Sequence, residues 1–219
     1  MPKSAFIRVR ELRQVFEPLS DSNFEAIIAR LAPLYEDLRI ELSGIAEDSI
    51  AALDVFDVRY RRIYFLRKSL STLSEFAEAI RQLESCPEFG LVASKFTPEI
   101  NTYWVRASAF FNRNEHPLKL VRNDIGGHFG LEAARFASQH LHPDAVDGIE
   151  MSEPFTKQGR VLLRFSGEVV ATAMLRHVWG LNREHQIRRL LKVARIGYRH
   201  ATRCVHCIVF CYLWDKLGR

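Results

Sequence analysis

The chain has 219 residues, of which 47% are hydrophobic and 26% are charged. This length and composition are those of one ordinary globular domain, and they argue against a disordered chain. The first 16 residues lack the apolar core of a secretory signal, and the longest nearly uncharged apolar run, residues 205–214, is far shorter than the roughly 20 residues of a membrane-spanning helix. We therefore expect a single domain over residues 1–219 that is cytoplasmic, neither secreted nor inserted in a membrane.

Positive charge is concentrated near the C-terminus. The chain carries a formal net charge of +5, yet residues 183–203 hold seven Lys or Arg and a single acid, which gives that segment alone +6. This imbalance predicts an anionic partner for the C-terminal helix in particular. Five basic residues in it share one helical face over about 22 Å, a row able to follow a phosphate backbone: Arg188, Lys192, Arg195, Arg199 and Arg203. An ordinary solvated helix face is the alternative.

Helical patterns dominate the N-terminal half. Residues 22–25 have the Ser-x-x-Glu form of a capping box, and apolar residues recur at helical spacing over residues 24–38. Pro33 is expected to kink or divide that helix, because proline lacks the amide hydrogen that the helix interior uses. A longer helical pattern covers about residues 48–84 and ends at the Cys-Pro pair of residues 86–87.

Two further helices are expected after a loop that reaches Thr97. The dipeptide Thr97-Pro98 has the form of an N-cap followed by proline at the first helical position. Pro117 is expected to open another helical segment, residues 118–137. Consecutive amphipathic helices with short connections are typical of an antiparallel helical bundle, with its core here over about residues 48–141.

The periodicity changes after Pro143. Two short runs within residues 149–165 flank a polar turn at residues 156–159, which predicts a small β-hairpin attached to the bundle. C-terminal helices are then expected over about residues 166–217, the last of them from about residue 183. The expected fold class is therefore all-α, an antiparallel bundle with one hairpin decoration.

One polar segment interrupts the apolar pattern of residues 118–137. If that stretch is a single α-helix, Arg122 and His128 fall on opposite flanks of its apolar stripe, where an unpaired charge is costly. Gly126 and Gly127 lie between them. Each glycine costs about 1 kcal/mol relative to alanine inside a helix, so the pair predicts a kink or a close approach to the backbone.

Arg122, Asn123 and His128 resemble the signature of the HEPN superfamily. In that signature an Arg is followed at once by a polar residue and, after a short spacer, by a His, on a helix of an all-α bundle; five residues separate Arg122 from His128 here. The resemblance implies a metal-independent, cofactor-free endoribonuclease whose site forms at a homodimer interface. Many such proteins are toxins or defence effectors that are paired with an antitoxin or another regulatory protein.

The chemistry of these side chains suits RNA cleavage. A histidine that titrates near neutrality can move the proton of the ribose 2′-hydroxyl, and a guanidinium can stabilise the phosphate charge of the transition state. His128 is then the general acid/base, Arg122 the phosphate clamp and Asn123 an orienting group. Two alternatives stay open: structural residues, with Arg122 paired to Glu132, Asp124 or a carbonyl, or a non-catalytic HEPN-like protein that binds a nucleotide or serves as a protein-interaction module.

A metal site is not expected. The residues that invite a zinc interpretation share one helical face, but the outer two lie about 16 Å apart along the axis, too far for ligands of a single ion: His200, Cys204, Cys207 and Cys211. We expect these cysteines to be reduced thiols that pack as small apolar residues. Phosphate-binding glycine loops and the Gly-x-Ser-x-Gly nucleophile motif are absent from the sequence.

Overall fold

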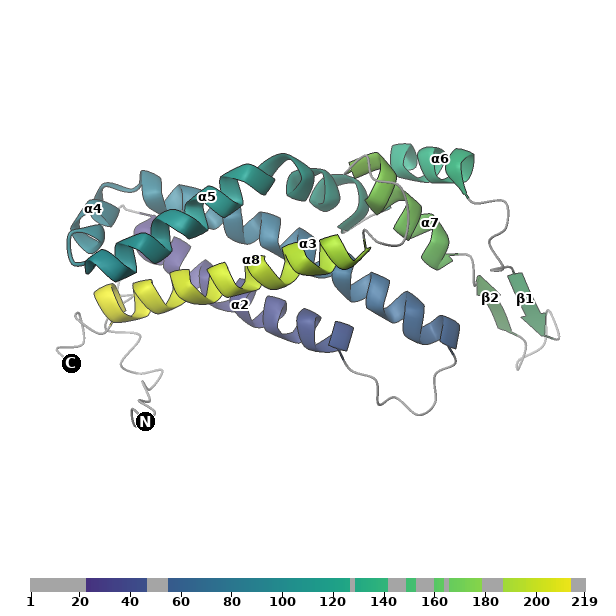
Figure 1. Ribbon diagram of the computed structural model, residues 1–219, viewed down its shortest axis with the longest axis horizontal. Helices are drawn as coiled ribbons and strands as arrows, with labels where there is room; N and C mark the ends of the chain where they lie inside the picture. The colour runs from purple at the N-terminus through teal and green to yellow at the C-terminus, as the bar shows by residue number, and fades with distance from the viewer. Residues whose placement is uncertain are drawn as a thin grey trace. The chain divides into compact units, whose positions relative to one another are not determined.

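The described part of the chain is almost entirely helical (Figure 1). The computed structural model describes residues 23–46, 55–126, 129–141, 149–152, 160–163, 166–178 and 187–213. Its α-helices are α2 (Phe24–Ala46), α3 (Val55–Ser85), α4 (Pro87–Ala93), α5 (Pro98–Leu120), α6 (Leu131–His140), α7 (Ser166–Thr172) and α8 (Ile187–Ile208). Within the described residues, three π-helical turns extend helices: η1 (Val121–Gly126), η2 (Ala173–Val178) and η4 (Val209–Leu213). The predicted all-α class is confirmed, and none of the described helices has the length and apolarity to cross a membrane.

Two short strands lie within the segment for which a hairpin was predicted. Strand β1 (Ile149–Ser152) pairs with β2 (Arg160–Leu163) in antiparallel register, with Ile149 opposite Leu163 and Ser152 opposite Arg160. Residues 153–159, which include the predicted turn, lie outside the described residues.

Prolines and caps mark several helix ends where the sequence predicts them. Helix α3 ends at Ser85, directly before the Cys-Pro pair. Helix α5 begins at Pro98, and the amide of Ile100 donates to the Thr97 hydroxyl over 3.3 Å, which confirms the predicted N-cap. Ser22 of the predicted capping box lies outside the described residues.

Two other prolines lie inside helices that continue past them. Pro33 lies inside α2, so it does not divide that helix, and Pro117 lies inside α5 instead of opening a new one. Around Pro117, Phe111 and Leu118 are both fully buried. Core packing on both sides of the proline therefore holds the helix together despite the lost hydrogen bond, an example of tertiary context overriding propensity.

Helix α4 occupies a segment for which a loop was predicted, so that prediction was wrong. Proline is at the first turn of α4, a position that leaves no hydrogen bond unmade. Phe89 of α4 packs against Trp104 at 5.0 Å between ring centroids and against Phe96 at 6.2 Å. This aromatic contact with α5 stabilises a helix that is too short to form on its own propensity.

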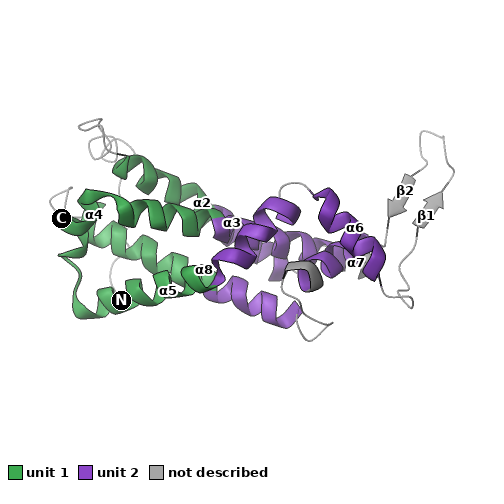
Figure 2. Ribbon diagram, turned by 90° about the horizontal axis from the view of Figure 1, so that it is seen from above, with its two compact units in different colours: residues 1–36, 75–113, 197–219 green, residues 37–74, 114–196 purple. Residues whose placement is uncertain are grey.

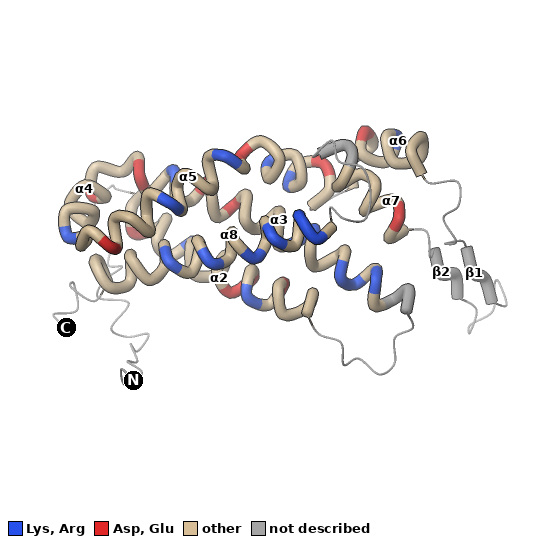
Figure 3. The backbone as a smooth tube through the Cα atoms, in the orientation of Figure 1, with Lys and Arg blue, Asp and Glu red and all other residues tan. Residues whose placement is uncertain are grey.

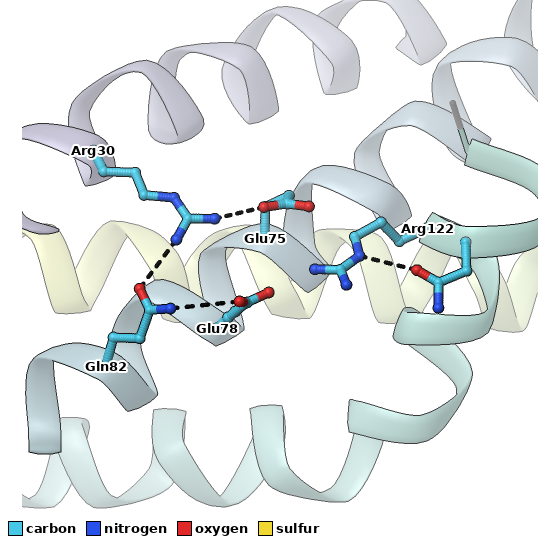
Figure 4. A network of polar contacts seen from close by, with 6 residues as sticks. Arg30, Glu75, Glu78, Gln82 and Arg122 are labelled. Atoms are coloured by element: carbon cyan, nitrogen blue, oxygen red, sulfur yellow. Dashed lines mark hydrogen bonds and ion pairs between the residues drawn. The ribbon is translucent and has the colours of Figure 1, made fainter. Parts of the chain in front are cut away.

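The chain divides into two compact units, and α2, α3, α5 and α8 contribute residues to both (Figure 2). Unit 1 consists of residues 1–36, 75–113 and 197–219. Its helices are joined by polar contacts as well as by a core: Arg30 pairs with Glu75 over 2.5 Å and donates to Gln82 over 3.1 Å (Figure 4).

Glu84 is a second polar junction in unit 1. Its carboxylate accepts hydrogen bonds from the indole nitrogen of Trp104 over 2.7 Å and from the hydroxyl of Ser108 over 2.6 Å. Both donors belong to α5, so this one side chain ties α3 to α5 and satisfies the buried indole.

Unit 2 consists of residues 37–74 and 114–196 and contains the motif segment, the stretch of residues 118–137 that holds Arg122 and Asn123. In it η1 and η2 contact each other, and α6 packs against η1, η2 and α7. Unit 2 has an apolar core of its own. Its buried residues include Leu66, Leu70, Leu118, Val121, Ile125, Ala133, Ala137, Val170 and Met174. The motif segment thus rests on a packed core within its own unit.

Candidate functional site

The motif segment is not the single α-helix that the sequence predicts over residues 118–137. After Leu120 the chain forms the π-helical turn η1, Phe129 and Gly130 are not helical, and α6 starts at Leu131. The amide of Gly130 donates to the carbonyl of Asp124 over 2.7 Å. The assumption of one regular helix with 100° per residue, on which the placement of Arg122 and His128 depended, was therefore wrong.

Gly126 provides the close approach that the glycine pair predicts. A Cβ atom at this position would lie 2.5 Å from Oγ and 2.7 Å from Cβ of Ser71 on α3. Only glycine lets the η1 backbone come this close to α3 without displacing that side chain. Gly127 lies outside the described residues.

Replacing Gly126 with alanine is expected to lower the free energy of unfolding by about 1–3 kcal/mol, the usual cost of overpacking. Gly90 of α4 is a matched control, because a Cβ there has no atom within 4 Å. Gly90→Ala should be neutral or slightly stabilising. Urea denaturation of both variants and of Gly126→Ala/Ser71→Gly measures the effect; equal stabilities for Gly126→Ala and the parent would contradict the contact.

The structure brings Arg122 and Asn123 together on η1. The Arg122 side chain is half-buried, and its Nε donates to Oδ1 of the exposed Asn123 over 3.2 Å (Figure 4). Val121 and Ile125 on the same turn are fully buried and anchor it. This hydrogen bond joins the side chains of two neighbouring residues of the predicted site. His128, the third residue of the predicted site, lies outside the described residues.

Glu132, one of the partners considered for Arg122, pairs with another arginine. Its carboxylate lies 2.7 Å from Nη1 of Arg135, one turn along α6, and both side chains are exposed. An exposed pair of this kind contributes little to stability.

The predicted basic row runs along α8. Arg188, Lys192, Arg195 and Arg199 are exposed, and α8 contains no acidic residue. At 100° per residue these positions lie opposite the buried side of the helix, which includes Leu190. Figure 3 shows the Lys and Arg positions recurring along α8.

Arg203, the last residue of the row, is half-buried and differs from the other four. Its guanidinium lies 4.6 Å from the centroid of the Tyr103 ring, and Tyr103 donates to Glu99 over 2.8 Å. Within the described part of the chain, none of the five basic residues forms an ion pair. The row therefore presents uncompensated positive charge.

Cys204 and Cys207 are buried on the apolar side of α8, and Cys211 is buried on η4. Burial raises the pKa of Cys204 well above its ordinary value and that of Cys207 to about 11, so both stay protonated thiols. The ring of His200 packs on Phe110 at 5.0 Å, and burial, followed by the charges of Arg203 and Arg199, lowers its pKa. Among the described residues no group of three His, Cys, Asp or Glu is placed to hold a metal ion.

Glu41 is a titratable residue that the sequence analysis missed. It accepts a hydrogen bond from the hydroxyl of Thr72 on α3 over 3.0 Å, and its Oε2 is buried without a partner among the described residues. Burial raises the pKa of Glu41 to about 7, with Asp37 adding to the rise while Thr72 and Lys68 oppose it. Glu41 is three residues after Leu38 and four before Ile45, which are both buried, so it lies on the apolar face of α2. This helical spacing is visible in the sequence and could have identified Glu41.

Glu41 is expected to make stability depend on pH. Its folded pKa of about 7 lies above the ordinary 4.5, so the folded protein binds the proton more tightly than the unfolded chain does. The free energy of unfolding contributed by this group is thus fully present below about pH 4.5 and is lost as the pH rises to about 7. Glu41→Gln should melt at a higher temperature than the parent at pH 8 and show a smaller advantage at pH 5; a pH-independent difference would contradict the shifted pKa.

Comparisons with protein-family models, with curated proteins and with solved structures each gave no match. The resemblance to the HEPN superfamily accordingly rests on Arg122, Asn123 and His128 themselves.

Proposed function

We propose that this protein is a metal-independent endoribonuclease of the HEPN type, with a HEPN-like antiparallel bundle as its scaffold. The observation that supports the proposal is the position of Arg122 and Asn123 on a π-helical turn that is anchored by buried side chains. Such turns occur frequently at functional sites, because they place side chains where a regular helix does not.

Cleavage needs no metal in this proposal. His128 takes the proton from the ribose 2′-hydroxyl, whose oxygen attacks the adjacent phosphorus. The bond from phosphorus to the 5′-oxygen of the next nucleotide breaks, that oxygen takes a proton from water, and His128 then releases its proton to the solvent. The products are a 2′,3′-cyclic phosphate and a 5′-hydroxyl. Arg122 stabilises the charge on the phosphate oxygens, and its bond from Nε to Asn123 sets the direction of the guanidinium.

The basic row of α8 binds the RNA backbone in this proposal. Its exposed cations have no carboxylate partner among the described residues. RNA binding therefore breaks no ion pair of the row, and the release of counterions from the RNA contributes its full free energy to binding. The protein acts in the cytoplasm as a homodimer that joins two copies of the motif, and an antitoxin or other regulatory protein controls it as a toxin or defence effector.

The alternative is a non-catalytic HEPN-like protein that binds a nucleotide or serves as a protein-interaction module. The hydrogen bond between Arg122 and Asn123 favours this alternative, because it occupies one of the donors that a catalytic guanidinium would offer to the phosphate. In this alternative the protein binds an anion but does not cleave RNA.

Incubation of the purified protein with single-stranded RNA in excess EDTA distinguishes the two. The proposal expects fragments that end in 2′,3′-cyclic phosphate. Intact RNA at every enzyme concentration, together with binding of a mononucleotide, would favour the non-catalytic alternative.

A further inference from the structure

Arg203 of α8 and Tyr103 of α5 form a cation–π pair where the two helices meet in unit 1 (Figure 2). The guanidinium carbon of Arg203 lies 4.6 Å from the centroid of the Tyr103 ring, and both side chains are half-buried. No hydrogen bond or ion pair joins Arg203 to a residue that the structure describes. The ring engages one face of the guanidinium and none of its N–H donors, so these remain for solvent or for a ligand.

Glu99 fixes the position of the Tyr103 ring. The Tyr103 hydroxyl donates to Oε1 of Glu99, one turn earlier on α5, over 2.8 Å. This hydrogen bond and the charge of Glu99 raise the pKa of Tyr103, so the ring stays a neutral phenol. A phenol that donates to a carboxylate has a more electron-rich ring, which strengthens its attraction for the guanidinium. The pair is therefore preorganised, and a planar ligand that stacks on it loses little of its binding free energy to the ordering of these side chains.

A free cation and two more rings lie near this pair. Arg199 is exposed, forms no ion pair with a described residue and precedes Arg203 by one turn of α8. The rise between the two is about 6 Å, a separation that one nucleotide spans between its base and its phosphate. The ring of His200 packs on Phe110 of α5 at 5.0 Å. Basic residues beside aromatic rings are the combination with which proteins bind single-stranded nucleic acids.

We propose that Tyr103 and Arg203 form a base-binding position of the RNA surface on α8. A base stacks on the guanidinium face opposite the Tyr103 ring, and Arg199 contacts the phosphate of the same nucleotide. The inference rests on the proposed function and narrows its substrate to RNA with unpaired bases, because the bases of a duplex are stacked on one another and offer no free face. Arg203 thus acts through its planar face, whereas the exposed cations of the row act through their charge.

Fluorescence anisotropy of a short labelled single-stranded RNA in EDTA, over a series of salt concentrations, tests the inference. The reference and every variant carry His128→Ala, so that cleavage does not interfere. Tyr103→Leu should weaken binding about tenfold, the effect of losing one base–aromatic stack. The slope of log affinity against log salt should not change, because stacking neutralises no phosphate. Tyr103→Phe keeps the ring and should retain most of the affinity.

Two controls distinguish base stacking from a change in the fold. Tyr64→Leu removes another tyrosine ring that contacts an arginine, Arg67 of α3 at 5.2 Å, and should bind RNA as the reference does. The second control is an abasic strand of the same length, which keeps the phosphates and lacks the bases. It should bind the reference more weakly than the normal strand, and Tyr103→Leu should not weaken its binding further.

Loss of affinity in Tyr103→Leu for the normal strand alone, at an unchanged salt slope, supports the base-binding position. An equal loss for the abasic strand would show that Tyr103 only supports the backbone contacts of α8, and full affinity of Tyr103→Leu for the normal strand would show no role in binding. Either result would overturn the inference and leave the proposed function standing, because cleavage is measured separately with His128 present. A reference that binds no RNA would overturn the RNA surface of α8 and, with it, the inference.

Discussion

Arg122→Ala is expected to reduce the rate of RNA cleavage about a thousandfold, because the charge of the pentavalent phosphate then develops without its guanidinium. The RNA should still bind through the basic row of α8. The loss should therefore be mainly in the single-turnover rate at saturating protein, measured on a short single-stranded RNA in EDTA, and less in the concentration that gives half of the maximal rate.

Arg135→Ala is the matched control, since it removes an exposed arginine of the same unit whose partner is Glu132 on its own helix. Its cleavage rate should equal that of the parent. Arg122→Lys should recover only a small part of the rate, because lysine keeps the charge but offers neither the planar pair of donors nor the Nε that Asn123 holds. A parental rate in Arg122→Ala would remove Arg122 from the mechanism.

Neutralising the exposed basic row of α8 is expected to weaken RNA binding about a hundredfold at physiological salt. The variant changes Arg188, Lys192, Arg195 and Arg199 to glutamine and keeps Arg203, which packs on Tyr103. Losing four phosphate contacts to a single strand should reduce the slope of log affinity against log salt by about 2.8. Fluorescence anisotropy over a series of salt concentrations measures both quantities.

A control of equal charge distinguishes a specific surface from the net charge of the chain. It changes four other exposed cations to glutamine: Arg106, Arg113, Lys119 and Arg135. This variant should keep most of the parental slope. If both variants lost the same affinity, the row on α8 would have no special role.

Much of the helix pattern was predictable from local chemistry. The Cys-Pro pair after Ser85 and the Thr97-Pro98 cap each act through the chemistry of one or two residues, and α3 ends and α5 begins as these predict. Pro33 and Pro117 show the limit of the same rule. Whether a proline ends a helix depends on how firmly its neighbours are buried, and burial is decided by helices distant in the sequence.

The candidate site was predictable in its residue types but not in its backbone. Glycine at position 126 indicated a close approach, yet the partner that approaches, Ser71, is 55 positions earlier in the chain. The π-helical turn leaves no periodic signature that distinguishes it from an α-helix over six residues.

The measurement that tests the central claim most directly compares two RNAs of identical sequence, one of them methylated at every 2′-oxygen. In excess EDTA the protein should cleave the unmodified strand to 2′,3′-cyclic phosphate ends and leave the methylated strand intact, because Arg122 and His128 are proposed to activate the 2′-hydroxyl as the nucleophile. Cleavage of both strands would indicate attack by water, and cleavage of neither would contradict a metal-independent ribonuclease.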